Sequence, residues 1–262
     1  MNKKSIVKSK DKVIGIVGGM GPQAGLTLCN DILKNTVAEL DQHHLPMVLM
    51  SFPNSIVDRT AFLEGRISVN PAYQISEVIF ALERIGAEVI GLACNTAYVP
   101  RILNVILQEL EKRQSEVQLL HMPIETCNWV QKRFPHIKRL GLISSTGMYR
   151  SRLYQDLFQD RGFEVITPDL DFQQDVVSKL IYDPVIGIKS NPEVLPPEGQ
   201  SLLFRILNFY RERAVELIIL GCTELPIVLS KKEYEGIQIV SCIDAMARAL
   251  IKEARSPVAA PF

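Results

Sequence analysis

The sequence predicts an α/β protein with two similar domains, each built on a mostly parallel sheet flanked by helices. Three observations lead to this fold class. Short apolar runs rich in Val, Ile and Leu alternate with longer amphipathic segments, two blocks of sequence recur, and the interval between the blocks is nearly the same in both copies. Strands that alternate with helices form parallel sheets with both faces covered.

The expected strands are the apolar runs, and the expected helices are the amphipathic segments between them. We expect strands at residues 12–19, 46–52, 87–93, 117–122, 138–144, 163–168, 215–221 and 237–242. We expect helices at residues 23–40, 71–85, 100–113, 123–133, 150–161, 172–181, 198–213 and 243–254.

The recurring blocks favour duplication of one α/β unit. "KVIGIVGGMG" (12–21) aligns without a gap with "KRLGLISSTG" (138–147), and "AEVIGLAC" (87–94) aligns with "VELIILGC" (215–222). Buried strands also resemble one another by chance, but chance does not preserve the interval between them. If the two units are related by a pseudo-twofold axis, their strand ends face one interdomain cleft, where parallel sheets bind ligands.

Composition excludes several functional classes. Lys and Arg together number 29, as do Asp and Glu, so no basic excess indicates a nucleic-acid partner. No apolar window has the roughly 18 residues of a membrane helix, and no signal-peptide core follows the basic stretch at 1–11. We therefore expect a cytoplasmic protein with no membrane partner. None of the five cysteines forms a C-x-x-C pair, and no His/Cys spacing indicates a metal site.

Two cysteines stand where catalytic groups are expected. Cys94 and Cys222 each end an apolar strand and precede small polar residues that begin helices well. A helix N-terminus favours the thiolate form of a cysteine and also binds carboxylates. A thiolate on one face of a carbon and a thiol on the other can invert a stereocentre. Cys29, Cys127 and Cys242 are interpreted as packing residues.

A nucleotide site is the alternative for the glycine-rich turn. Gly19, Gly21 and Ala24 nearly match the dinucleotide fingerprint. That fingerprint needs an acidic residue at the end of the second strand, whereas Glu39 and Asp41 precede this strand. The turn is therefore expected to let the backbone approach a small ligand.

Four stretches together resemble the aspartate/glutamate racemase superfamily, and most closely its aspartate racemase branch. They are "GIVGGMGP" (15–22), "DRTAF" (58–62), "ACNTA" (93–97) and "GCTELP" (221–226), and "YDPVIGIKSN" (182–191) resembles the lysine-bearing segment of the family. The resemblance implies a homodimeric racemase without cofactor. It also implies a first domain of 12–115 plus 223–262 and a second of 116–222.

The resemblance assigns roles residue by residue. Cys94 and Cys222 inherit the exchange of the α-proton, and Arg59 and Lys189 match the residues that bind substrate carboxylates. Positions that line the amino-acid substrate are matched by Met20, Asn95, Thr96 and Thr223. Glu224 either caps the following helix or keeps Cys222 poised.

One position departs from the family. Many members read C-N-T-A-H, and this chain carries Tyr98 in place of the histidine. The predicted function is racemisation of aspartate or glutamate without pyridoxal phosphate. The alternatives are a related isomerase or decarboxylase acting on a dicarboxylate, and a catalytically weak amino-acid-binding protein.

Overall fold

The computed structural model describes residues 10–191 and 193–256, so most of the basic stretch at 1–11 lies outside the described residues. Among the described residues the chain divides into two compact units. One unit contains the positions up to Glu125 together with those from Ile243 onward, and the other is Thr126–Cys242. Each unit contains its own sheet, in the order β2-β1-β3-β4 or β6-β5-β7-β9-β8.

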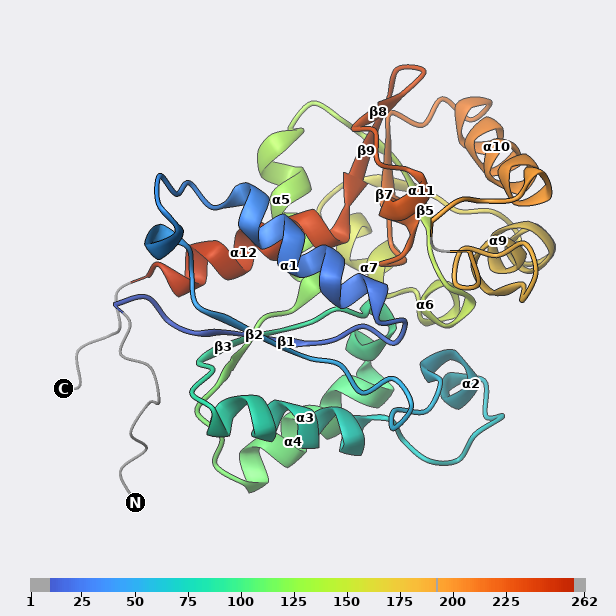
Figure 1. The fold of residues 1–262 in the computed structure, drawn as a ribbon. Helices are drawn as coiled ribbons and strands as arrows, with labels where there is room; N and C mark the ends of the chain where they lie inside the picture. The colour runs from blue at the N-terminus through green and yellow to red at the C-terminus, as the bar shows by residue number, and fades with distance from the viewer. Residues whose placement is uncertain (1–9, 192, 257–262) are drawn as a thin grey trace. The chain divides into compact units, whose positions relative to one another are not determined.

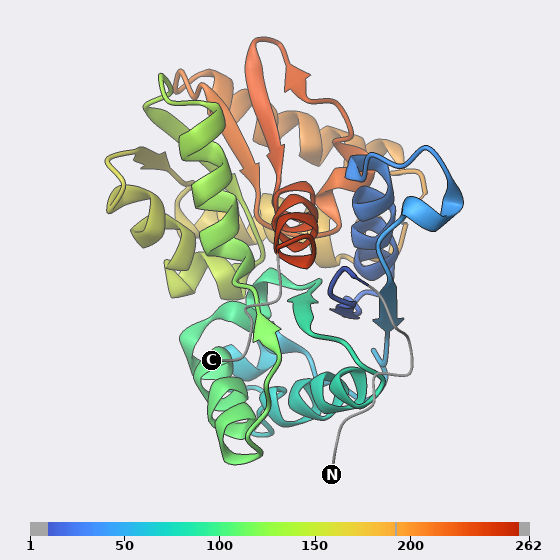
Figure 2. The same ribbon diagram turned by 90° about the vertical axis from the view of Figure 1, so that its left-hand side faces the viewer.

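The first sheet is parallel throughout. Helices α3 and α4 lie together on one of its faces, and α1 and α12 lie on the other (Figures 1 and 2). The strands are β1 (Ile14–Val17), β2 (Met47–Met50), β3 (Val89–Leu92) and β4 (Gln118–Leu119). The helices are α1 (Gln23–Asn35), η1 (Asp41–His43), α2 (Arg59–Leu63), α3 (Ala72–Arg84), η2 (Asn95–Tyr98), α4 (Pro100–Lys112), α5 (Met122–Arg133) and α12 (Cys242–Ala254).

The second sheet is parallel except for a short strand at its edge. Its strands are β5 (Arg139–Ile143), β6 (Glu164–Ile166), β7 (Leu217–Leu220), β8 (Glu233–Tyr234) and β9 (Ile237–Ser241). The helices of this unit are α6 (Thr146–Ser151), α7 (Leu153–Gln159), α8 (Leu170–Phe172), η3 (Gln173–Ser178), α9 (Lys179–Tyr182), α10 (Pro197–Arg211) and α11 (Leu225–Val228), and α5 continues into it.

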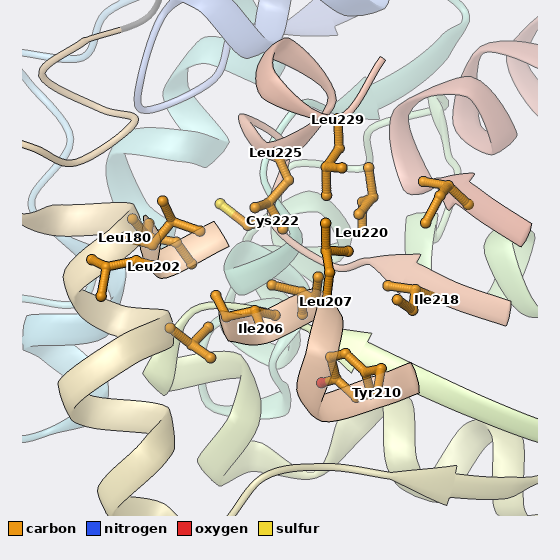
Figure 3. Close-up of a cluster of buried hydrophobic side chains, with 14 of the residues drawn as sticks. Leu180, Leu202, Ile206, Leu207, Tyr210, Ile218, Leu220, Cys222, Leu225 and Leu229 are labelled. Carbon is orange, nitrogen blue, oxygen red and sulfur yellow. The ribbon is translucent and has the colours of Figure 1, made fainter. Parts of the chain in front are cut away.

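One hydrophobic cluster fills the second unit between its sheet and the helices α9 and α10. The ring of Tyr210 packs where a Cβ on Gly141 would lie, 2.6 Å from its Cδ1 atom, so only glycine at position 141 lets α10 approach β5. The Tyr210 hydroxyl donates to the carbonyl of Leu142. Cys222 belongs to the same cluster and lies beside Leu225 (Figure 3).

The α/β fold with two mostly parallel sheets is confirmed, and several local features differ from the expectation. The short helices α2 and α11 were not expected, and the helix expected at 150–161 is replaced by α6 and α7. Strand β8 was not predicted. It pairs antiparallel with β9 through a two-residue turn, in which Glu235 and Gly236 have φ values of 45° and 84°. Such left-handed pairs match the twist of a hairpin. The single helix expected at 172–181 is instead α8, η3 and α9 in succession, and η3 is a π-helix.

The compact units and the predicted domains have different bounds. The predicted second domain is 116–222, whereas the second compact unit is Thr126–Cys242 and includes β9, which pairs with β7 along its length. Helix α12 then belongs to the first unit, where Met246 and Leu250 pack over Gly91 of β3. Among the described helices, none is long and apolar enough to span a membrane.

Candidate active site

Cys94 and Cys222 occupy equivalent places in the two sheets. Leu92 of β3 pairs with Val17 of β1, and Cys94 follows two residues later. Leu220 of β7 pairs with Ile143 of β5, and Cys222 again follows two residues later. Both thiols are buried, with exposed fractions of 8% and 7%. Each unit therefore places one cysteine at the carboxyl edge of its sheet, where α/β proteins bind ligands.

Glycines bring the turn after β1 close to Cys94. A Cβ on Gly19 would lie 2.3 Å from the carbonyl oxygen of Gly21 and 2.9 Å from that of Ala93. Backbone atoms cannot yield as a flexible side chain can, so any other residue at position 19 would displace this turn. These contacts are between parts of the protein itself, and the approach of the turn to a small ligand stays a prediction.

Arg59 is held against the same turn. Its Nη2 donates to the carbonyl of Met20, and its Nη1 donates to the carbonyl of Val57 at 3.2 Å. Asp58 precedes α2 and accepts from the backbone N–H of Ala61 at 2.7 Å, which fixes the start of the helix. Helix α2 also contacts η2, the turn that carries Asn95 and Thr96. Arg59 is only 6% exposed, so these contacts hold its guanidinium in one position.

Tyr98 supports the end of β3. Strand β4 ends at Leu119, which pairs with Ile90, so β4 does not extend to Leu92. The Tyr98 hydroxyl instead accepts from the N–H of Leu92 at 3.0 Å. The Tyr98 ring also packs on His121, with 5.0 Å between ring centroids. Burial lowers the pKa of His121.

Replacing Tyr98 with Phe should destabilise the protein without removing the site. The change leaves the Leu92 N–H without the hydroxyl, at a cost of about 1–3 kcal/mol for a buried donor. Urea unfolding of Tyr98→Phe beside the native protein measures this cost. Unchanged stability would show that the hydroxyl does not support β3.

The second unit brings three charged or ionisable groups together. The Cys222 thiol donates to Glu224 Oε2 at 3.3 Å. Lys189 Nζ lies 2.6 Å from Glu224 Oε1, and it also lies over the ring of Tyr182, 5.6 Å from the centroid. Glu224 therefore uses one carboxylate oxygen for the thiol and the other for the ammonium group.

Burial and charge shift the pKa values of this group. Burial raises the pKa of Cys222, the negative charge of Glu224 raises it further, and Lys189 partly opposes both. For Lys189, burial lowers the pKa, but the negative charges of Glu224, Cys222 and Tyr182 and the hydrogen bond to Glu224 together raise it, and the net shift of the pKa is upward. The two shifts favour the ammonium form of Lys189 and the thiol form of Cys222.

Thr146 is a candidate site residue that the sequence did not single out. It is the first residue of α6, in the turn that follows β5, and it is 4% exposed. Its Oγ1 has no hydrogen-bond partner among the described residues. Gln173 of the π-helix η3 donates to the carbonyl of Ser144 at 3.0 Å and so fixes this turn. The internal alignment contains the signal, because it places Thr146 opposite Met20.

The structure gathers the predicted residues into two sets, one in each unit. Met20, Arg59, Cys94, Asn95 and Thr96 belong to the first unit, and Lys189, Cys222, Thr223 and Glu224 belong to the second. Hydrogen bonds join Arg59 to Met20 and join Glu224 to both Lys189 and Cys222. Within residues 10–191 and 193–256, no group of three or more His, Cys, Asp or Glu side chains could hold a metal ion.

Comparisons with known proteins find relatives of this chain that are named as racemases. The chain is 26% identical over 246 residues to the broad specificity amino-acid racemase RacX of Bacillus subtilis (strain 168), covering 91% of this chain and 96% of RacX. The aspartate racemase of Picrophilus torridus superposes with a TM-score of 0.76 at 28% identity, covering 93% of this chain and 94% of that one. An arylmalonate decarboxylase variant shares the fold, with a TM-score of 0.56 at 16% identity and 94% of each chain covered.

The family described as Asp/Glu/hydantoin racemase matches residues 17–250, a range that begins at the end of β1 and ends within α12. The match therefore includes both cysteines, the arginine of α2 and the Lys189–Glu224 pair. The chain belongs to the Asp/Glu/hydantoin racemase family.

Proposed function

We propose that the protein racemises an acidic amino acid, aspartate or glutamate, by two-base proton exchange without pyridoxal phosphate. The observation that carries the proposal is the equivalent placement of Cys94 and Cys222, each two residues beyond a paired strand end. Family membership and similarity to an aspartate racemase and a broad-specificity racemase support it.

The chemistry needs one proton acceptor and one proton donor. With the thiolate on Cys94, the α-proton moves to Cys94 Sγ and the C–H electron pair stays on the substrate as a carbanion. The Cys222 thiol then gives its proton to the opposite face of the α-carbon. The product has inverted configuration, and the site is left with a Cys94 thiol and a Cys222 thiolate, ready for the reverse reaction.

Binding groups must hold the α-carbon between the two thiols. Arg59 is proposed to bind one substrate carboxylate, because arginine suits bidentate carboxylate binding and its guanidinium is already positioned. Lys189 is proposed to bind a carboxylate through the ammonium hydrogens that Glu224 does not use. Asn95, Thr96, Thr223 and Met20 would line the amino acid, and the active protein would be a homodimer in the cytoplasm.

Alpha-proton exchange followed by NMR tests this proposal. The purified protein is incubated with reductant in deuterated water with single enantiomers of aspartate, glutamate and neutral amino acids. Loss of the α-proton signal of L-Asp or L-Glu, together with appearance of the D-form, is the expected result. Absence of exchange with every amino acid would overturn the proposal.

The same experiment separates the alternatives. A decarboxylase or isomerase would leave amino acids unchanged and would transform a dicarboxylate without an amino group. An amino-acid-binding protein would gain thermal stability with an amino acid but would leave its α-proton in place. Cysteines at both strand ends favour exchange on two faces over one-cysteine decarboxylation.

A further inference from the structure

The two cysteines differ in their second neighbour along the chain. Glu224 stands two residues after Cys222, and Thr96 stands at the same position after Cys94. The strand ends are otherwise equivalent in register, so this pair of residues is the clearest asymmetry between them. A carboxylate beside only one of the two thiols affects which of the two cysteines is protonated in the resting protein.

Two contacts of Glu224 indicate which group donates in its hydrogen bond with Cys222. Its Oε1 accepts a bond of 2.6 Å from the Lys189 ammonium, which is the geometry of a charge-assisted pair with an ionised carboxylate. An ionised carboxylate has no hydrogen to donate. The hydrogen between Oε2 and Cys222 Sγ, 3.3 Å apart, must therefore be the thiol hydrogen.

We infer that Glu224 is a positioning residue that keeps Cys222 in its protonated form in the ligand-free protein, with Lys189 as the cation paired with the Glu224 carboxylate. The geometry of the three groups carries the inference. The charged groups that act on the thiol are Glu224 on its own turn and Lys189 from the segment after α9, and Lys189 in turn lies over the ring of Tyr182. The raised pKa of Cys222 agrees with it.

This inference deepens the proposed function and depends on it for one consequence. A racemase whose resting proton lies on Cys222 is ready to donate from that side. It therefore accepts first the enantiomer that presents its α-proton to Cys94. The enantiomer whose α-proton faces Cys222 can react only after Cys222 has lost its own proton. The resting state of Cys222 can itself be measured without any substrate.

The pH dependence of alkylation of Cys222 tests the inference. Iodoacetamide reacts with the thiolate, and mass spectrometry of the peptide that contains Cys222 gives its rate at each pH. In Glu224→Gln the neighbouring negative charge is absent and Lys189 remains. The midpoint of reaction should fall by about one pH unit or more. The quantity compared is the pH at which the alkylation rate is half its maximum. Easier access of iodoacetamide to the thiol would change the maximal rate but not this midpoint.

Two controls accompany this variant. Glu233→Gln changes an exposed carboxylate of the same unit, whose partner is Gln238, and it should leave the Cys222 midpoint in place. The labelling of Cys94 in each sample reports whether the reagent and the fold are intact. A Cys222 midpoint in Glu224→Gln that stays constant or rises overturns the inference. So does a Cys222 that stays unlabelled to high pH while Cys94 reacts.

Circular dichroism shows whether Glu224→Gln folds. If it does not fold, a second variant tests the inference. In Lys189→Met the opposing cation is removed, so the Cys222 midpoint should rise, and an unchanged or lower midpoint overturns the inference. These readouts contain no substrate. If the Cys222 midpoint shifts as expected but the protein exchanges no α-proton, the proposed racemase function is refuted and the role of Glu224 stands.

Discussion

Cys94→Ser and Cys222→Ser are each expected to lower the rate of racemisation by about 100-fold or more, the usual loss for an acid or base group. Serine is close in size to cysteine, but its hydroxyl is a far weaker acid than a thiol and does not form an anion at neutral pH. Inversion needs both faces of the α-carbon, so neither cysteine can replace the other. Chiral chromatography of the D- and L-forms measures the loss.

Isotope exchange distinguishes this mechanism from a general loss of structure. A protein with one cysteine left can still remove the α-proton from one enantiomer and return a deuteron to the same face. Each single variant should therefore exchange one enantiomer without inverting it, and the two variants should prefer opposite enantiomers. Cys29→Ser, at a half-buried position of α1, is the matched control and should retain native rates.

Racemisation within about threefold of the native rate in both cysteine variants would contradict the two-base mechanism. The same preferred enantiomer in both variants would mean that the cysteines do not act on opposite faces. A single essential cysteine would move the chemistry toward the one-cysteine decarboxylase reading.

Most of the fold can be predicted from the sequence, because the spacing of apolar residues along the chain reflects which faces of each strand and helix are buried. Strands β1, β3, β5 and β7 are buried on both faces, and they read as uninterrupted apolar runs. The internal alignment even anticipates the register, since Gly15 pairs with Ile90 and Gly141 with Ile218. Short elements leave a weaker record. Strand β8 has two residues, too few for any period to appear.

Sequence motifs single out candidate site residues, but they do not give the contacts between those residues. Cys94 and Cys222 could be placed because each ends a recognisable strand. The bond between Lys189 and Glu224 joins residues 35 positions apart in sequence, and no local pattern encodes such a contact. The sequence shows that Tyr98 replaces the family histidine, but it does not show what the tyrosine contacts. Its hydroxyl accepts a hydrogen bond from the backbone of β3, and this contact depends on where β4 ends.

Gly19→Ala is expected to lower racemisation by about 100-fold while the protein remains folded. The added Cβ would lie 2.3 Å from the Gly21 carbonyl oxygen, 2.6 Å from Ala24 Cβ and 2.9 Å from the Ala93 carbonyl oxygen. Relief requires the turn after β1 to move away from Ala93, the residue before Cys94. That turn also carries the carbonyl of Met20, which holds Arg59. A displacement of about 1 Å can cost 100-fold in rate.

Gly91→Ala provides the matched control, because it adds the same methyl group to the strand that leads to Cys94. There the Cβ meets Met246 Cε at 2.7 Å and Leu250 Cδ1 at 3.0 Å, the ends of flexible side chains on α12. Repacking of this kind costs about 1–3 kcal/mol of stability. The backbone of the site stays in place, so the rate should remain near the native one. Urea unfolding and α-proton exchange on both variants separate the two costs. Equal loss of rate in Gly19→Ala and Gly91→Ala would mean that general destabilisation, rather than the turn after β1, sets the activity.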